Sequence, residues 1–186
     1  MQASSNPHDE KSSNKQPTAG KSNREPALRI APSTMIPQTD EPTVNVHYGS
    51  PLVEAPSIGP KTAKRFEAIG IRTIRQLVST GSDEIVQGLA TRWITEDLVR
   101  DWQDQARLVC EVPALTGYRA QLLVAIGCRT SWQLRTANAN NLFQQLSQFC
   151  ETAEGQQILR SNRTPTVDDV VRWIDSAKQF ARREVA

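Results

Sequence analysis

The chain has 186 residues, of which 22 are Lys or Arg and 20 are Asp or Glu, giving a formal net charge of +2. This length leaves room for one tail and one modest domain, and this charge excludes a protein that is basic over its whole surface. The only histidines, His8 and His47, lie ahead of the apolar part of the chain. We therefore expect no enzyme, no metal site and no cofactor, because the folded part lacks an imidazole for acid–base work or metal binding.

Residues 1–50 are rich in Ser, Asn, Pro, Gln and Lys and nearly lack large apolar side chains. Such a segment cannot bury enough surface to offset the entropy lost on ordering, so we expect a disordered tail and linker. Val44, Val46 and Tyr48 alternate like a short strand, but an extended linker docked loosely on the domain is favoured. No signal peptide or membrane-spanning run is visible, so we expect a soluble, cytoplasmic protein with no membrane partner.

The stretch 56–77 predicts two short helices joined by a tight turn. Gly59 and Pro60 start the first helix, because the first helical turn tolerates a proline. Gly70 ends it, since the position after a helix commonly takes the left-handed conformation that suits glycine. Thr73 then caps the second helix.

Two more helices follow in the first half of the domain. Ser82, with two acidic residues after it, starts a middle helix, and Thr95 starts a closing helix whose apolar stripe includes Trp102. No strand pattern follows, so we expect an all-α domain over residues 51–182.

The whole arrangement is repeated. Nine residues recur 57 places later: Pro56, Ala63, Ala68, Ile69, Gly70, Arg72, Thr73, Gln76 and Leu77 return as Pro113, Ala120, Ala125, Ile126, Gly127, Arg129, Thr130, Gln133 and Leu134. The closing helix returns 71 places later, where Trp102 matches Trp173. The chain therefore divides into a first half, 52–110, and a second half, 111–182, with 14 extra residues around 144–163 in the second half.

The second half carries its own signals. Asn138 caps a longer middle helix, which Gly155 is expected to interrupt. Thr166 and Asp169 open the last helix as a capping box with a shortened acid. Cys128 takes the repeat position of Ile71, which predicts a reduced, buried thiol that acts as a small hydrophobe.

The runs 58–63 (Ile-Gly-Pro-Lys-Thr-Ala) and 69–73 (Ile-Gly-Ile-Arg-Thr), followed by Leu77, resemble the helix-hairpin-helix element of many DNA ligases, polymerases, nucleases and recombination proteins. From about Leu52 to Phe180 the pattern resembles a bacterial family of unknown function, family 4332, built on two such elements. The resemblance implies two tandem helix-hairpin-helix units packed into one compact helical domain. It supplies no established activity.

In helix-hairpin-helix proteins the turn is typically Gly-apolar-Gly, and its backbone N–H groups hold a phosphate together with the helix N-terminus. The first turn here is Ser57-Ile58-Gly59, which keeps the second glycine. The second turn, residues 114–117 (Ala-Leu-Thr-Gly), loses both aligned glycines and has Gly117 one place late. We therefore expect phosphate binding at the first turn rather than at the second.

The candidate nucleic-acid-binding residues are Ser57, Gly59, Lys61, Thr62, Lys64 and Arg72 in the first half and Gly117, Arg119 and Arg129 in the second. Together they could hold the phosphate backbone of duplex DNA, or of another nucleic acid, without reading its sequence. From Leu52 onward 17 basic residues face 15 acidic ones, which allows a local basic patch only. The plain alternative is that Lys61 and Lys64 form the solvated face of an amphipathic helix. The chain would then be a protein-interaction or scaffold module that has lost nucleic-acid binding, and the sequence leaves both functions open.

Other chemistry has weaker support. The acidic pairs 83–84 and 168–169 fall in the first turns of predicted helices, where the helix dipole accounts for them. The match between Trp102 and Trp173 predicts core anchors rather than base-stacking platforms. Trp132 stands where the first half has Arg75, so it is the best candidate for an exposed aromatic, either covered by the 14-residue insertion or meeting a partner.

Overall fold

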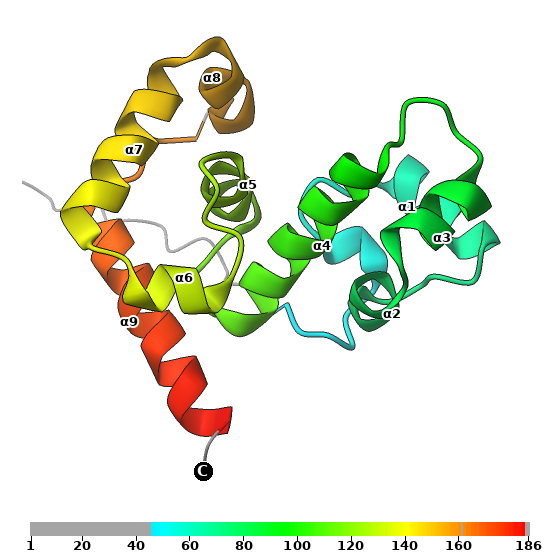
Figure 1. Cartoon of the computed structure of the whole chain (residues 1–186), viewed down its shortest axis with the longest axis horizontal. Helices are drawn as coiled ribbons and strands as arrows, with labels where there is room; N and C mark the ends of the chain where they lie inside the picture. The colour runs from blue at the N-terminus through cyan, green and yellow to red at the C-terminus, as the bar shows by residue number, and fades with distance from the viewer. Residues whose placement is uncertain (1–45, 161, 185–186) are drawn as a thin grey trace, which may run out of the picture. The chain divides into compact units, whose positions relative to one another are not determined.

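A computed structural model describes residues 46–160 and 162–184, all of which belong to one unit of the chain, Asp40–Ala186. Most of the predicted disordered tail, residues 1–45, lies outside the described residues. Within the described ranges the elements are η1 (Leu52–Glu54), α1 (Pro60–Ala68), α2 (Ile74–Ser79), α3 (Ser82–Leu89), α4 (Glu96–Glu111), α5 (Gly117–Ala125), α6 (Ser131–Thr136), α7 (Ala139–Glu151), α8 (Ala153–Leu159) and α9 (Val167–Glu184) (Figure 1). This part of the chain contains helices and no strand, as the all-α prediction requires. None of these helices has the length and apolar content needed to cross a membrane.

The internal repeat is visible in the backbone of the two helix pairs α1–α2 and α5–α6. Gly70 and Gly127 follow the first helix of each pair with φ of +86° and +87°, the left-handed conformation that the sequence predicts. Thr73 and Thr130 each form a capping box with the glutamine three residues later. The backbone N–H groups of Arg72 and Arg129 both donate to those glutamine side chains at 2.8 Å. The two pairs therefore share the left-handed glycine and the capping box of the turn between their helices.

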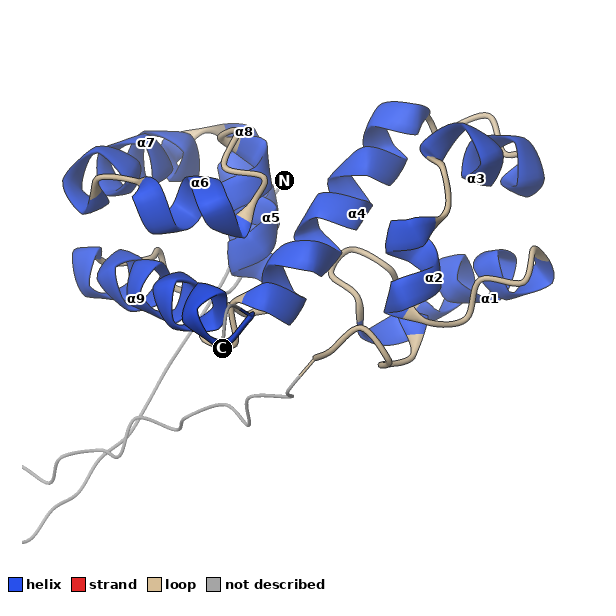
Figure 2. Ribbon diagram, turned by 60° about the horizontal axis from the view of Figure 1, so that its bottom comes forward, coloured by secondary structure: helices blue, strands red, loops and turns tan. Residues whose placement is uncertain are grey.

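Each half has its own hydrophobic core. In the first half Phe66 packs against Trp102 with ring centroids 5.9 Å apart, and in the second half Leu123 and Trp173 take the equivalent positions. Both tryptophans are buried, at 4% and 1% exposure, which confirms that they anchor the cores. Helix α4 passes between α1–α3 and α5–α9 (Figure 2). Its early apolar residues belong to the first core and Leu108 to the second, so one amphipathic helix ties the halves together.

One of two predicted helix boundaries needs correction. Ser82 is the first residue of α3, as predicted, and Gly81 takes the N-cap position. Gly155 does not interrupt a helix: the break falls at Thr152, and Gly155 lies buried inside α8. A Cβ at Gly155 would clash with the carbonyl oxygen of Phe149, so a glycine is needed where α8 folds back closely on α7. The extra residues of the second half form the end of α7 and α8.

The end of the predicted linker is firmly attached to the first half. The backbone N–H of Arg75 donates to the carbonyl oxygen of Tyr48 at 2.7 Å, and that of Ile74 to Ser50 at 3.1 Å. The Tyr48 hydroxyl donates to Glu111 Oε1 on α4 at 2.7 Å. This segment, colored cyan in Figure 1, is thus more closely bound than the loosely docked linker that the sequence predicts.

The three cysteines are free thiols. Cys128 and Cys150 are buried and Cys110 is half-buried. Burial raises the pKa of the Cys128 thiol to about 11, so this residue is a neutral core side chain, as its repeat position predicts.

Candidate nucleic-acid interface

The first turn connects η1 to α1 and presents two exposed residues around one buried anchor. Ile58 is buried at 3% exposure, whereas Ser57 and Gly59 on either side of it are exposed. Ser57 has a φ of +62°, a left-handed conformation that favours glycine. Its hydroxyl donates to Gln105 Oε1 on α4 at 2.7 Å. The buried Ile58 and the hydrogen bond to α4 therefore hold the turn in place, while Ser57 and Gly59 stay accessible to solvent.

The N-terminus of α1 is open. Gly59 is its N-cap, with no side-chain capping bond, and a Cβ built there would meet no atom within 4 Å. The φ of Gly59 is −81°, so the backbone does not itself demand glycine. Pro60 has no N–H, and the amides of the next two residues, Lys61 and Thr62, begin a helix whose positive dipole end faces outward. This end of α1 can accept an anion at close range.

Exposed cations flank this helix end. Lys61 and Lys64 are both exposed and lie three residues apart, which places them on one side of α1. Thr62 is half-buried between them. Within the described residues, all ion pairs involve other cations: Arg100, Arg107, Arg129, Arg163, Arg172 and Lys178. Arg72 is also exposed, but it lies beyond the far end of α1, about 13 Å along a nine-residue helix.

The second turn is arranged differently. Thr116 is the N-cap of α5 and Gly117 its first residue, and a Cβ on Gly117 would lie 3.8 Å from the Cβ of Pro56. Pro56 of the first turn therefore packs against the second turn and half-buries Gly117. The Thr116 hydroxyl is buried without a hydrogen-bond partner. Ala114, the repeat equivalent of Ser57, is not among the residues of the described chain with positive φ.

The two arginines predicted for the second half are engaged elsewhere. The guanidinium of Arg119 lies over the rings of Tyr118 and Trp173, at 5.3 and 5.8 Å from their centroids. Arg129 forms ion pairs with Asp101 at 2.7 Å and with Asp104 at 2.9 Å. The hydrogen bond to Asp104 is the main cause of the raised pKa of Arg129. The structure thus gathers the five candidates from Ser57 to Lys64 at one helix end, whereas the side chains of Arg119 and Arg129 contact aromatic rings and carboxylates of the protein itself.

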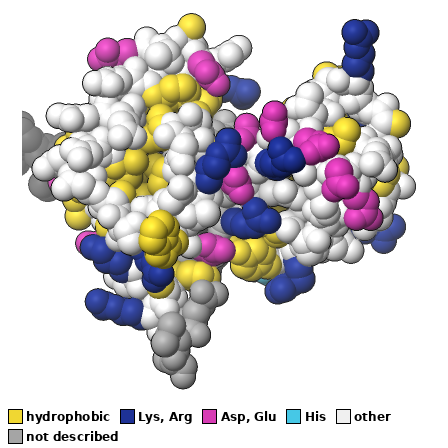
Figure 3. Space-filling view, in the orientation of Figure 1, with side chains coloured by type: hydrophobic (Ala, Val, Ile, Leu, Met, Phe, Trp, Pro, Cys, Tyr) yellow, Lys and Arg dark blue, Asp and Glu magenta, His cyan; other side chains and the backbone are white. Residues whose placement is uncertain are grey.

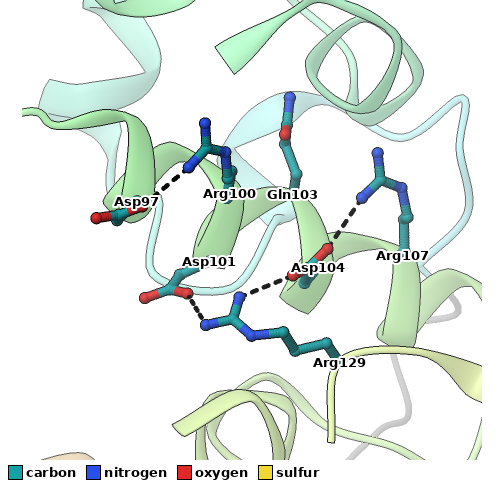
Figure 4. A pocket seen from close by; sticks show the side chains of 7 residues that line it. All are labelled: Asp97, Arg100, Asp101, Gln103, Asp104, Arg107 and Arg129. Atoms are coloured by element: carbon teal, nitrogen blue, oxygen red, sulfur yellow. Dashed lines mark hydrogen bonds and ion pairs between the residues drawn. The ribbon is translucent and has the colours of Figure 1, made fainter. Parts of the chain in front are cut away.

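Arg129 lines a charged pocket of about 500 Å³ (Figure 4). Its lining residues are Asp97, Arg100, Asp101, Gln103, Asp104, Arg107 and Arg129. Asp104 pairs with both Arg107 and Arg129, and Arg100 pairs with Asp97. In Figure 3, basic and acidic side chains are mixed near the middle of the visible face. The ion pairs of Arg129 join the α5–α6 turn to α4. Because the lining contains three arginines and three aspartates, the pocket has no excess positive charge that would attract an anion.

The sequence interpretation missed one exposed aromatic and identified another. Trp93, between α3 and α4, is 54% exposed, and the guanidinium carbon of Arg65 lies 5.8 Å from its ring centroid. The repeat could have identified Trp93, because the equivalent residue 71 places later is Thr164. A polar residue there indicates that this position does not belong to the core that the two halves share. Trp132 on α6 is 60% exposed, so the extra residues of the second half do not cover it.

Comparison with known families agrees with the extent of the repeat. A family model described as "Domain of unknown function (DUF4332)" matches residues 56–180, about two thirds of the chain. The chain belongs to this family. The DUF4332 match begins in the first turn, covers the second turn and both buried tryptophans, and ends within α9. No curated protein and no solved structure matches the chain.

Proposed function

We propose that this DUF4332 protein is a non-enzymatic, cytoplasmic module of two tandem helix-hairpin-helix units that binds the phosphate backbone of duplex DNA without sequence specificity. Helices α1–α2 form the binding unit, and α5–α6 form a unit that has lost most of its phosphate contacts. One observation carries the proposal. The N-terminus of α1 is open, has no side-chain capping bond and is flanked by Lys61 and Lys64, whereas the equivalent end of α5 lies against Pro56.

The expected contacts follow from the chemistry of that helix end. A phosphate oxygen accepts hydrogen bonds from the amides of Lys61 and Thr62, and the two lysine ammonium groups neutralise the charge. Only one or two phosphates fit such a patch, so we expect an affinity in the non-specific range, about 10⁻⁴ to 10⁻⁶ M. Each neutralised phosphate releases counterions, which gives a shallow dependence of the binding constant on salt, with a logarithmic slope of about −1 to −2.

Docking of a protein partner is the second candidate function, and Trp132 is the observation that favours it. A tryptophan that is 60% exposed on a short helix presents a large apolar surface, which is typical of interaction sites. In this case the second half would carry the contact, and the open end of α1 would be an ordinary solvated helix terminus.

Fluorescence-polarisation titration of the full chain against a labelled DNA duplex, at low and moderate salt, separates these candidates. The double variant Lys61→Glu/Lys64→Glu should weaken binding at least about tenfold and flatten the salt dependence. The matched control Arg182→Glu/Arg183→Glu reverses the same number of exposed charges on the last turn of α9 and should change the affinity much less. Absence of binding at low salt, or equal losses in both double variants, would contradict the proposal.

A second pair of variants tests whether the two turns are unequal. Gly59→Val fills the space that the phosphate needs, and the open surroundings and negative φ of Gly59 mean that the fold should tolerate it. Thr116→Val changes the equivalent position of the second turn. We expect a clear loss of affinity for Gly59→Val and none for Thr116→Val, and equal effects would show that the turns are functionally alike.

A further inference from the structure

Trp93 is an exposed ring held in a fixed orientation. It lies in the connection between α3 and α4, directly before Ile94, which is buried in the first core. Its ring meets that of Trp102 at 6.4 Å between centroids and 75° between planes, an edge contact with a core side chain. The core therefore fixes the indole, while more than half of its surface remains open to solvent.

The surroundings of this ring are basic. Arg65 stands over it from α1 and donates a 3.2 Å hydrogen bond to Thr91 Oγ1. Arg65 shares its side of α1 with Lys61, one turn earlier, and the exposed Arg92 directly precedes Trp93. The nearest carboxylates in sequence, Glu96 and Asp97, are both paired with Arg100, at 2.6 and 3.0 Å. A stripe of positive charge thus runs along α1 from the open helix end to Trp93.

We propose that this protein prefers DNA that carries an unpaired base next to a duplex, and that this base inserts between the Trp93 ring and the Arg65 guanidinium. The inference rests on the proposed function. From Gly59 to Arg65 the helix rises about 9 Å, which matches two to three nucleotides at a rise of about 3.4 Å each. A strand with one phosphate at the helix end therefore reaches Trp93 a few nucleotides later. Bases inside a duplex are already stacked, so only an unpaired base can occupy this position.

The gap between the two groups is close to what a base requires. A base stacked between two planes needs about 3.5 Å on each side, or about 7 Å in total. The guanidinium carbon of Arg65 is 5.8 Å from the Trp93 centroid and is restrained by one exposed hydrogen bond, to Thr91. A movement of about 1 Å by this long, exposed side chain opens the site. Stacking of one base on an aromatic side chain changes affinity by about 5- to 150-fold, without dependence on which base it is.

The test compares three probes with the full chain by fluorescence polarisation: a blunt DNA duplex, the same duplex with a short thymine overhang, and the same duplex with an abasic overhang of equal length. We expect the thymine overhang to bind at least about fivefold more tightly than the other two. Trp93→Ala should remove this gain and leave blunt-duplex binding unchanged, whereas Trp93→Phe should retain most of it. Trp132→Ala, which removes an equally exposed tryptophan from the second half, should leave the preference intact.

The outcomes distinguish the two proposals. Equal affinity of the wild-type chain for thymine and abasic overhangs would overturn the base-stacking inference, whether or not the Trp93→Ala variant folds. In that case the proposed function still stands if the wild-type chain binds the blunt duplex and the Lys61→Glu/Lys64→Glu variant does not. Absence of binding to any of the three probes at low salt would overturn both.

Discussion

Arg72 and Arg129 occupy the same position in the two halves, yet of these two arginines only Arg129 forms ion pairs within the described chain. Both donate their backbone N–H to a capping glutamine at 2.8 Å. The side chain of Arg129 meets Asp101 and Asp104 because α4 precedes the second half and packs against it. The first half is preceded by the linker end instead, which offers backbone groups rather than carboxylates. The segment that precedes each half thus decides whether this arginine forms ion pairs that stabilise the fold.

Substitution of these two arginines should separate binding from stability. Arg72→Ala should leave the free energy of unfolding nearly unchanged and reduce the slope of log affinity against log salt by well under one, because Arg72 lies beyond the far end of α1 and contacts neither of the phosphates expected at its N-terminus. Arg129→Ala should leave that slope unchanged and lower the free energy of unfolding by about 1 kcal/mol. Urea denaturation and polarisation titrations of both variants check this. A smaller salt slope for Arg129→Ala would show that its ion pairs open to bind DNA.

Features that depend on a few neighbouring residues could be predicted from the sequence. Gly70, Gly127, Thr73 and Thr130 act through local backbone conformation and capping bonds, which the chain encodes within four or five residues. The burial of Trp102 and Trp173 was also accessible, because the repeat supplies a second copy against which an apolar position can be checked.

Features that depend on distant contacts could not be predicted. Gly155 looked like a helix breaker, but its role comes from the approach of α8 to the backbone at Phe149, which no local pattern reveals. Arg129 was a candidate for binding nucleic acid because it is the repeat equivalent of Arg72. Its carboxylate partners lie 25 and 28 residues earlier on another helix, where the local sequence does not reveal them. Trp93 is a different case, because the equivalent position in the second half is Thr164, and a comparison of the two halves could have shown that Trp93 is not a shared core position.

The backbone at Ser57 provides a direct test of the first turn. Because its φ is +62°, a residue with a Cβ is strained there by about 1 kcal/mol relative to glycine. Ser57→Gly and Ser57→Ala both lose the hydrogen bond to Gln105, so the difference between them isolates the backbone. We expect Ser57→Gly to be more stable than Ser57→Ala by about 1 kcal/mol in urea denaturation. At the equivalent position of the second turn, Ala114→Gly should instead lower stability by about 0.5 kcal/mol, and a gain there would show that the two turns share one conformation.

The buried hydroxyl of Thr116 predicts an unusual gain in stability. This N-cap makes no side-chain capping bond and its oxygen has no partner, so Thr116→Val removes an unsatisfied polar group without losing a hydrogen bond. We expect the free energy of unfolding to rise by about 1 kcal/mol. Thr73→Val is the matched control, because the Thr73 hydroxyl accepts the N–H of Gln76 and its loss should cost about 1 kcal/mol. Thermal and urea denaturation measure both changes, and a loss of stability in both variants would contradict this account of Thr116.

Asp169 should make the stability of the second half depend on pH. The carboxylate is fully buried at the start of α9 and accepts hydrogen bonds from Arg163 at 2.6 and 2.9 Å, from Arg172, and from the N–H of Thr166 at 2.9 Å. Burial alone would raise its pKa, but the hydrogen bonds from Arg163 and Thr166 outweigh burial and hold the pKa well below its usual range. A lowered folded-state pKa stabilises the fold above the unfolded pKa of about 3.9, and this contribution is lost as the pH falls through the folded pKa.

Asp169→Asn should therefore lower the free energy of unfolding by about 2 kcal/mol at pH 7, because charge-assisted hydrogen bonds are lost. The difference from the wild-type chain should shrink steadily as the pH is lowered below about 4, where the unfolded wild-type carboxyl takes up its proton. Urea denaturation at pH 7, 5 and 3, followed by circular dichroism, measures this difference. Asp168→Asn, which changes the exposed neighbour in the same helical turn, should stay within about 0.5 kcal/mol of the wild-type chain at every pH. A difference for Asp169→Asn that is the same at pH 7 and pH 3 would mean that its charge does not stabilise the start of α9.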